Sequence, residues 1–279
     1  MQIRKRTLLK SALVAALACT AAAGVLTGCS RQAPEEKPAA QQDLLARIKA
    51  RGTITIAMEG TWSPWTYHDK DGRLTGFDVA IGERIARALG VKAEFIEGKW
   101  DGLLAGLDAG RYDLMINGVG ITPERERAYD FSEPYAYDRV AVIVRGGRTD
   151  ITRMEDLKGR HTANTISSTY AETAEKAGAR VTGVDDLNQT FELLLSGRID
   201  ATLNSEVTYA DYKRAHPDAD IKIALFTPEA GEIGVALKKG ADTASLRAAV
   251  NETISGLRAS GELSELSRRF FGLDITTKK

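Results

Sequence analysis

Strands and helices alternate singly along most of this chain of 279 residues, and this order limits the folds it can adopt. Thr53–Met58 is a β-branched, apolar run that suits a buried strand. Residues 77–89 place apolar side chains at i, i+4 and i+8, which predicts an amphipathic helix that ends at Gly90. Further strands are expected over 91–96, 114–116 and 140–144, and a further helix after Asp101. Single helices between strands favour an α/β fold with mostly parallel sheets.

One segment of the chain recurs together with its surroundings. Residues 110–117, GRYDLMIN, resemble residues 197–204, GRIDATLN, and each copy follows a leucine-rich helical stretch. Each copy predicts a helix, a glycine stop and a strand that ends at an asparagine, Asn117 or Asn204. Because open α/β sheets bind ligands at the carboxyl ends of their strands, the repeat predicts two similar lobes with a cleft between them. The alternative is that helix–glycine–strand units recur by chance in any α/β protein.

The composition excludes several other classes of protein. Hydrophobic residues make up 43% of the chain and charged residues 27%, as in an ordinary folded protein. Lysine plus arginine and aspartate plus glutamate both total 38, so there is no basic excess and we expect no nucleic-acid partner. Two cysteines, Cys19 and Cys29, are too few for a disulfide framework, and His68, His161 and His216 lack metal-ligand spacing. We therefore expect neither a metal nor a cofactor.

The first thirty residues differ in character from the rest. Four basic residues precede an apolar run over 12–25, which is shorter than the roughly 20 residues of a membrane-spanning helix. This order is typical of a secretory signal peptide. The tetrapeptide LTGC that follows, ending at Cys29, resembles the lipobox of bacterial lipoproteins, whose cysteine receives fatty acyl chains such as palmitate. A plain signal peptide with an incidental cysteine is the alternative.

The lipoprotein interpretation fixes the mature chain. Residues 1–28 would be removed, and residues 29–43, which are polar and rich in proline and alanine, would form a flexible tether. The exported chain would carry 34 basic residues against 38 acidic ones, because the leader holds four basic residues and no acidic residue. We therefore expect a mildly acidic protein that is lipid-anchored at the outer face of a bacterial membrane.

Seven short motifs are spread over residues 44–274. They are EGTWSPW at 59–65, DGRLTGFD at 71–78, WDG at 100–102, ITPER at 121–125, DFSEPY at 130–135, DLKG at 156–159 and FFG at 270–272. In this order they resemble the extracellular solute-binding proteins, family 3, of amino-acid ABC importers. Within that family, the opening Glu-Gly-Thr, the segment KWDG and the ending FGLDIT are most similar to the cystine-binding branch.

The resemblance implies a two-lobed, hinged fold of the periplasmic-binding-protein type II, with a mostly parallel sheet flanked by helices in each lobe. Lobe one would comprise residues 44–139 and 235–274, and lobe two residues 140–234, with crossings near 139–142 and 231–235. The family captures a polar amino acid between the lobes and delivers it to an ABC permease. We expect a monomeric binding protein that is not an enzyme, with cystine or cysteine as the favoured ligand.

The ligand carboxylate is expected at Arg125, where the family motif places an arginine. A guanidinium is a permanently charged, planar donor that can bind a carboxylate through two hydrogen bonds. Without the resemblance, the charges of residues 124–127 would indicate a solvated helix surface. Ser168 and Thr169 lie where relatives open a helix whose backbone N–H groups reach the same carboxylate, and they also suit ordinary helix caps. Ser167 replaces a glycine that is usual in the family.

Further positions of the site follow from the same resemblance. Asn117, Gly118 and Gly120 match the segment whose backbone faces the ligand ammonium, and small residues permit close approach of the main chain. Trp62 corresponds to the aromatic wall of the family, whereas Trp100 suits either the pocket or the core. An aromatic face suits an apolar or cationic ligand side chain.

The ammonium partner departs from the family pattern. Many relatives carry an aspartate five residues after the position of Asp200, where this chain has Ser205 followed by Glu206. Because a desolvated ammonium requires a charged partner, we expect Glu206 to hold it from lobe two, at a turn or helix start after the strand. Glu59 is expected to meet a polar side chain or second amino group of the ligand, and it is the next candidate for the ammonium.

Three other functions are alternatives. Cyclohexadienyl dehydratases resemble this chain overall, and a cleft acid such as Glu59 or Glu206 would then protonate a leaving hydroxyl group. No nucleophile–base pair or phosphate loop in the sequence supports catalysis. A binding protein for another polar amino acid is the second alternative. A ligand-sensing receptor domain is the third, and we do not expect it because no transmembrane helix follows the last motif.

Overall fold

The computed structural model of the protein describes residues 43–278. The predicted leader, the lipidation site at Cys29 and nearly all of the tether lie outside these residues. The described residues belong to one compact unit. Within the described part of the chain, no helix has the length and apolar character needed to cross a bilayer.

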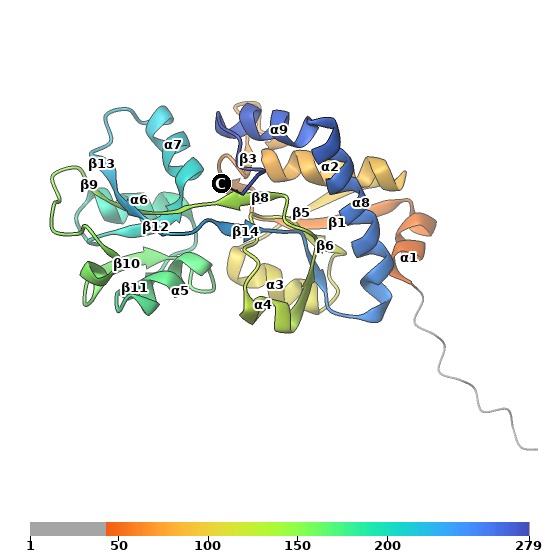
Figure 1. The fold of residues 1–279 in the computed structure, drawn as a ribbon, viewed down its shortest axis with the longest axis horizontal. Helices are drawn as coiled ribbons and strands as arrows, with labels where there is room; N and C mark the ends of the chain where they lie inside the picture. The colour runs from red at the N-terminus through yellow and green to blue at the C-terminus, as the bar shows by residue number, and fades with distance from the viewer. Residues whose placement is uncertain (1–42, 279) are drawn as a thin grey trace, which may run out of the picture. The chain divides into compact units, whose positions relative to one another are not determined.

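Five strands form the larger sheet, in the order β5-β1-β6-β15-β7. Figure 1 labels β5, β1 and β6 of this sheet. Their bounds are β1 Thr53–Met58, β5 Lys92–Glu97, β6 Leu114–Met115, β7 Tyr129–Phe131 and β15 Ala236–Lys238. β5, β1 and β6 are parallel, as the alternation of strands and helices predicts. β15 runs antiparallel to both of its neighbours, β6 and β7, and the chain enters it from β14.

Helices cover both faces of this sheet, because β1 buries side chains on each side. Ile54, Ile56 and Met58 belong to the core on one side, and Ala57 belongs to the core on the other. Four helices pack on the first side: α1 Leu44–Arg51, α2 Phe77–Leu89, α8 Ala244–Ser260 and α9 Glu262–Phe271. α3 Trp100–Asp108 packs on the second side (Figure 1). The two layers leave the carboxyl ends of β1 and β6 free to present side chains.

A second group of strands is built around β9. The order β12-β9-β13 forms one sheet, β10 pairs with β11 beside it, and a parallel bridge between Thr162 and Ala201 connects the two. The elements are β9 Val140–Arg145, β10 His161–Asn164, α5 Thr169–Lys176, β11 Arg180–Gly183, α6 Leu187–Leu195, β12 Thr202–Ser205, α7 Glu206–Ala215 and β13 Ile221–Phe226. The expected parallel pairing holds for β10 and β11, whereas β9 runs antiparallel to both of its neighbours, β12 and β13.

Two strands connect these groups. β8 Ala136–Asp138 and β14 Gly231–Ile233 pair antiparallel with each other (Figure 1). They lie close to the two crossings that the sequence predicts. The division into lobes at 139/140 and 234/235 stays a prediction, since the folded chain forms one unit. The remaining elements are β2 Thr61–Trp62, β3 Thr66–His68, β4 Leu74–Thr75, α4 Pro123–Ala128 and the 3₁₀ helices η1 Met154–Leu157 and η2 Ala241–Thr243.

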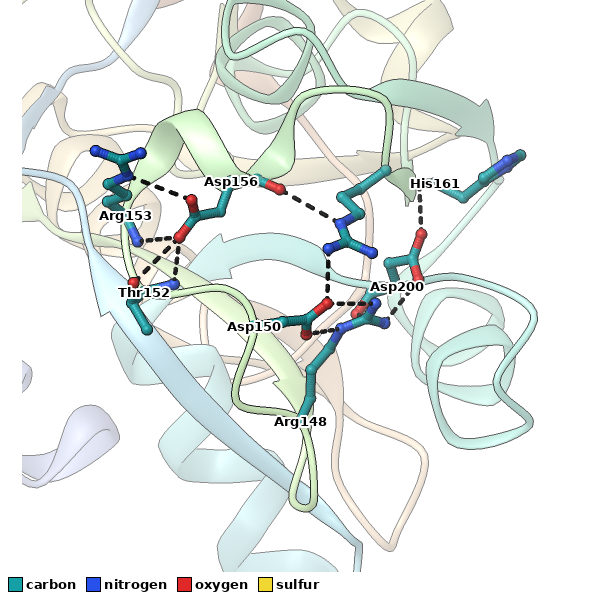
Figure 2. Close-up of polar contacts among 8 residues, drawn as sticks. Arg148, Asp150, Thr152, Arg153, Asp156, His161 and Asp200 are labelled. Atoms are coloured by element: carbon teal, nitrogen blue, oxygen red, sulfur yellow. Dashed lines mark hydrogen bonds and ion pairs between the residues drawn. The ribbon is translucent and has the colours of Figure 1, made fainter.

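Both copies of the repeated segment have the same local structure. Asp113, in the first copy, accepts a hydrogen bond from the Thr55 backbone N–H at 2.7 Å. Asp200, in the second copy, accepts one from the His161 backbone N–H at 2.9 Å (Figure 2). Each aspartate also accepts from an arginine guanidinium. The aspartate therefore fixes the start of its strand to a neighbouring strand, and the asparagine four residues later arrives at the other end.

Candidate functional site

A cavity lies where the two strand groups present these asparagines. Asn117 and Asn204 both line it, as the repeat predicts for a cleft at two strand ends. Most of the predicted site residues come together in its wall: Glu59, Trp62, Trp100, Asn117, Gly118, Arg125, Ser168 and Thr169. Gly120 and Glu206 are not among the lining residues.

Arg125 lies in the first turn of α4 and lines the cavity. Thr122 caps this helix by accepting the Arg125 backbone N–H at 3.2 Å. The guanidinium donates to the carbonyl oxygens of Gly120 at 3.0 Å and Ser167 at 3.1 Å, and it lies 5.2 Å from the centroid of the Trp100 ring. Burial lowers the pKa of Arg125, but the group stays charged because a guanidinium normally titrates far above neutrality. Its other N–H donors have no partner among the described residues and are free for an anion.

Glu59 and Asn117 meet where β1 and β6 end. The Asn117 side-chain oxygen accepts the Glu59 backbone N–H at 2.7 Å, and its nitrogen donates to the Glu59 carboxylate at 2.7 Å. Burial raises the pKa of Glu59 to about 7; the Asn117 hydrogen bond opposes this shift, and the charges of Asp101 and Asp186 add to it. A cation in the cavity would favour the carboxylate and so reverse the shift.

Trp62 forms an aromatic wall of the cavity. Its ring stacks on buried Trp65 at a centroid distance of 5.3 Å and meets the edge of Tyr170 at 6.3 Å. Gly118 leaves room for this ring, because a Cβ atom at that position would lie 2.5 Å from it. Buried Asp78 accepts the Gly118 backbone N–H at 2.5 Å and fixes the turn. Gly118, which is predicted to let the ligand approach the main chain, is therefore also required to make room for the Trp62 ring.

Ser168 and Thr169 lie at the start of α5 and line the cavity. The Ser168 hydroxyl accepts a backbone N–H of the first turn at 3.1 Å and donates to the Thr165 carbonyl at 2.6 Å, so it acts as the helix cap. Gly120 lies just behind this wall, because a Cβ atom at its position would be 3.4 Å from Thr169. Its carbonyl oxygen helps to hold Arg125, which is the contribution of Gly120 to the site.

The structure does not bring Glu206 to this cavity. Ser205 ends β12 and Glu206 begins α7, which is the helix start that the prediction required. The Glu206 carboxylate is instead held by Arg139 through two hydrogen bonds of 2.9 Å, and buried Ser205 donates to Asp138 at 2.7 Å. Glu206 therefore lies outside this cavity, and its role as the ammonium partner stays a prediction. Glu59 is the predicted carboxylate that does line the cavity.

Eight lining residues were not selected as site residues from the sequence. They are Thr61, Asn164, Thr165, Tyr170, Asp186, Leu187, Thr190 and Asn204. The sequence repeat could have identified Asn204 as a lining residue, since Asn204 ends the repeated segment. A helix-capping pattern could have identified Asp186, because it precedes an apolar helix and a glutamine follows three residues later. In the structure Asp186 accepts the Gln189 backbone N–H at 3.1 Å. The others reach the cavity through tertiary packing alone.

The charges of the cavity suit a small zwitterion. Among the described lining residues the charged groups are Arg125, Glu59 and Asp186, so a permanent cation faces two carboxyl groups. Trp62 and Trp100 add apolar surface. The described residues hold no group of three or more histidine, cysteine, aspartate or glutamate side chains placed to bind a metal ion.

Known proteins match this chain over most of its length. Residues 54–273 match the bacterial extracellular solute-binding proteins, family 3. The chain is 36% identical to the L-cystine-binding protein TcyA of Bacillus subtilis over 273 residues, which cover 98% of this chain and 99% of that one. The structure of an ancestral arginine-binding protein bound to arginine has a TM-score of 0.74 at 33% identity, covering 80% of this chain and 99% of that one. The L-cystine solute receptor of Neisseria gonorrhoeae in the unliganded open conformation has a TM-score of 0.56 at 42% identity, covering 84% and 99%.

Proposed function

Because the chain belongs to the bacterial extracellular solute-binding proteins of family 3, we propose that it captures a polar amino acid outside the cell and delivers it to an ABC permease. Cystine is the first candidate, because a relative that matches nearly the whole chain is named for cystine. Binding occurs without chemical conversion, and the protein acts as a monomer.

The main support for this proposal is that one cavity is lined by both a cationic residue, Arg125, and a carboxylate residue, Glu59. An α-amino acid presents a carboxylate and an ammonium on the same carbon atom. The free N–H donors of Arg125 take the carboxylate, and the Glu59 carboxylate takes the ammonium. Trp62 and Trp100 contact the rest of the ligand. The α-carboxylate and the α-ammonium thereby each keep a charged partner when they leave water.

We further propose that the two lobes predicted from the sequence close over the ligand. Contacts beside the cavity support this proposal: Asp101 accepts hydrogen bonds from the Ser167 backbone N–H at 3.0 Å and hydroxyl at 2.6 Å, and Lys99 pairs with Asp185 at 2.6 Å. The TM-score is lower for the open cystine receptor than for the arginine-bound ancestor, although the receptor is more similar in sequence. This contrast supports a closed arrangement of the described residues.

The proposal predicts that cystine raises the melting temperature of the purified protein. A ligand that binds only the folded state adds about 4 kcal/mol of stability when its free concentration is about a thousand times its Kd. A thermal-shift screen of cystine and the common amino acids, followed by calorimetry, measures this effect. Mass spectrometry of the bound ligand should find it unchanged. If no amino acid shifts the midpoint the proposal fails, and a ligand recovered in dehydrated form would favour the enzyme alternative.

We also propose that a lipid on Cys29 anchors the exported chain at the outer face of a bacterial membrane. The LTGC tetrapeptide and the polar tether after it support this placement. Cys29→Ser should move the protein from the membrane fraction to the soluble fraction and leave ligand affinity unchanged, since the folded part is untouched. Cys19→Ser, inside the leader, is the matched control and should keep the protein on the membrane. A Cys29→Ser protein that still sediments with membranes in high salt would contradict the lipid anchor.

A further inference from the structure

Two buried polar atoms of the cavity wall lack a hydrogen-bond partner among the described residues. They are the Trp100 indole N–H, a donor, and the Asn164 side-chain oxygen, an acceptor. The Trp100 ring lies beside Arg125, whose guanidinium is 5.2 Å from the ring centroid. Leaving a buried polar atom unpaired is unfavourable, so each atom indicates a ligand group of the opposite kind. A donor near Arg125 suits a ligand carboxylate, whereas the Asn164 acceptor suits a ligand group that donates hydrogen bonds.

The orientation of the Asn164 amide is fixed by the protein. Its nitrogen donates to the Leu203 carbonyl at 2.7 Å, which leaves the oxygen as the free atom. The residue is only 3% exposed, so bulk water does not replace the missing donor. The Asn164 backbone carbonyl accepts the Val184 N–H at 3.2 Å, and this bond brings the segment that leads into α6 beside it.

Asp186 adds a negative charge to the same wall. One of its carboxylate oxygens accepts the Gln189 backbone N–H at 3.1 Å, and the other has no partner among the described residues. Lys99, the neighbouring cation, pairs with Asp185 at 2.6 Å, is 73% exposed and does not line the cavity. Asn164 and Asp186 therefore offer two acceptors to the cavity, one of them charged. Lys99 lies near enough to interact with the Asp186 charge, but among the described residues no cation other than Arg125 lines the cavity.

We propose that Asp186 and Asn164 form a subsite for a second cationic group of the ligand, such as the distal ammonium of cystine. This inference rests on the proposed function, in which Arg125 and Glu59 hold the first carboxylate and ammonium. A second carboxylate would find no equivalent partner, because Arg125 is the one cation among the described lining residues. The subsite therefore recognises the distal ammonium of cystine and is indifferent to its distal carboxylate.

Two analogues of cystine separate these groups. The mixed disulfide of cysteine with 3-mercaptopropionate lacks one ammonium and keeps both carboxylates. The mixed disulfide of cysteine with cysteamine lacks one carboxylate and keeps both ammonium groups. By calorimetry in thiol-free buffer, loss of the ammonium should weaken binding by about tenfold to a hundredfold, the worth of a hydrogen bond to a charged group. Loss of the carboxylate should change the affinity by less than about threefold.

Asp186→Asn tests the residue itself. Asparagine is as good a helix cap as aspartate, so α6 is retained while the charge is removed. In this variant the preference between the two analogues should shrink to about threefold or less, whereas Asp185→Asn, the matched control at the exposed pair with Lys99, should keep it. Equal affinity of the wild-type protein for cystine and the ammonium-deficient analogue would overturn the subsite and leave cystine binding intact. An unchanged preference in Asp186→Asn would also overturn it.

A second pair of probes covers the case in which cystine does not bind. Arginine and citrulline have nearly the same shape, and only arginine carries a distal cation. If the wild-type protein prefers arginine and Asp186→Asn does not, the subsite holds for a different amino acid. If both bind equally, the subsite is overturned. If no amino acid binds, the proposed function fails together with it.

Discussion

Replacing Arg125 with methionine should weaken amino-acid binding by about 30-fold to several-thousand-fold, which corresponds to the 2–5 kcal/mol lost when one member of a buried charged pair is removed. Methionine keeps much of the length of the side chain but has neither charge nor donors. The ligand carboxylate would then face Trp100 and the carbonyl oxygens of Gly120 and Ser167, which now hold the guanidinium. Isothermal titration calorimetry with the ligand found in the thermal-shift screen measures the loss.

Arg127→Met is the matched control for this variant. Arg127 lies on the same short helix, but its side chain is 70% exposed and pairs weakly with Glu124 at 3.7 Å. Its replacement should leave the affinity within about threefold of the wild type, because exposed ion pairs contribute little. Melting curves of both variants without ligand show whether the fold is kept. Wild-type affinity in a folded Arg125→Met protein would remove Arg125 from the site.

Affinity for the ligand should fall by about tenfold for each pH unit below 7, because Glu59 must lose its proton before it can bind an ammonium. The pKa of Glu59 is raised to about 7 in the empty cavity, first by burial. A bound cation favours the carboxylate, so binding at pH 5 to 7 releases a proton. Calorimetry in two buffers with different ionisation enthalpies measures that release directly.

Glu59→Gln should flatten this pH dependence and bind more weakly than the wild type at pH 8, since a neutral amide oxygen is a poorer partner for an ammonium. Glu206→Gln is the control: it removes a carboxylate that pairs with Arg139 outside the cavity, and it should keep the full slope. A slope that survives in Glu59→Gln and disappears in Glu206→Gln would return the ammonium to Glu206.

Much of the fold followed from local patterns in the sequence. The strand Thr53–Met58 and the helix Phe77–Leu89 have the predicted bounds, because their apolar periodicity agrees with the side that each element buries. The parallel pairing of β1, β5 and β6 followed from the helices between them. The antiparallel direction of β9 and β15 did not, because it depends on crossings between two strand groups that no local pattern records.

Lining residues of the cavity could be predicted where one short motif contains both the functional side chain and the residues that position it. Arg125 follows a threonine cap in one short segment, so its placement needs little tertiary information. The pairing of Glu206 with Arg139 could not be predicted, because the two residues are distant in the sequence. Asn164 and Asp186 were missed for the related reason that β10 and α6 reach the cavity only after the second strand group has packed.

The pairing of β8 with β14 has a consequence for how the protein distinguishes ligands of different length. Two separate linkers could twist and slide independently, whereas two strands joined by backbone hydrogen bonds form a ribbon that bends across its face and resists sliding along its length. If the two predicted lobes rotate about this ribbon, we expect the rotation to follow one path. The distance between Arg125 and the acceptors around Asp186 would then be the same each time the lobes close. Ligands whose charged groups are separated by a different length would bind less tightly.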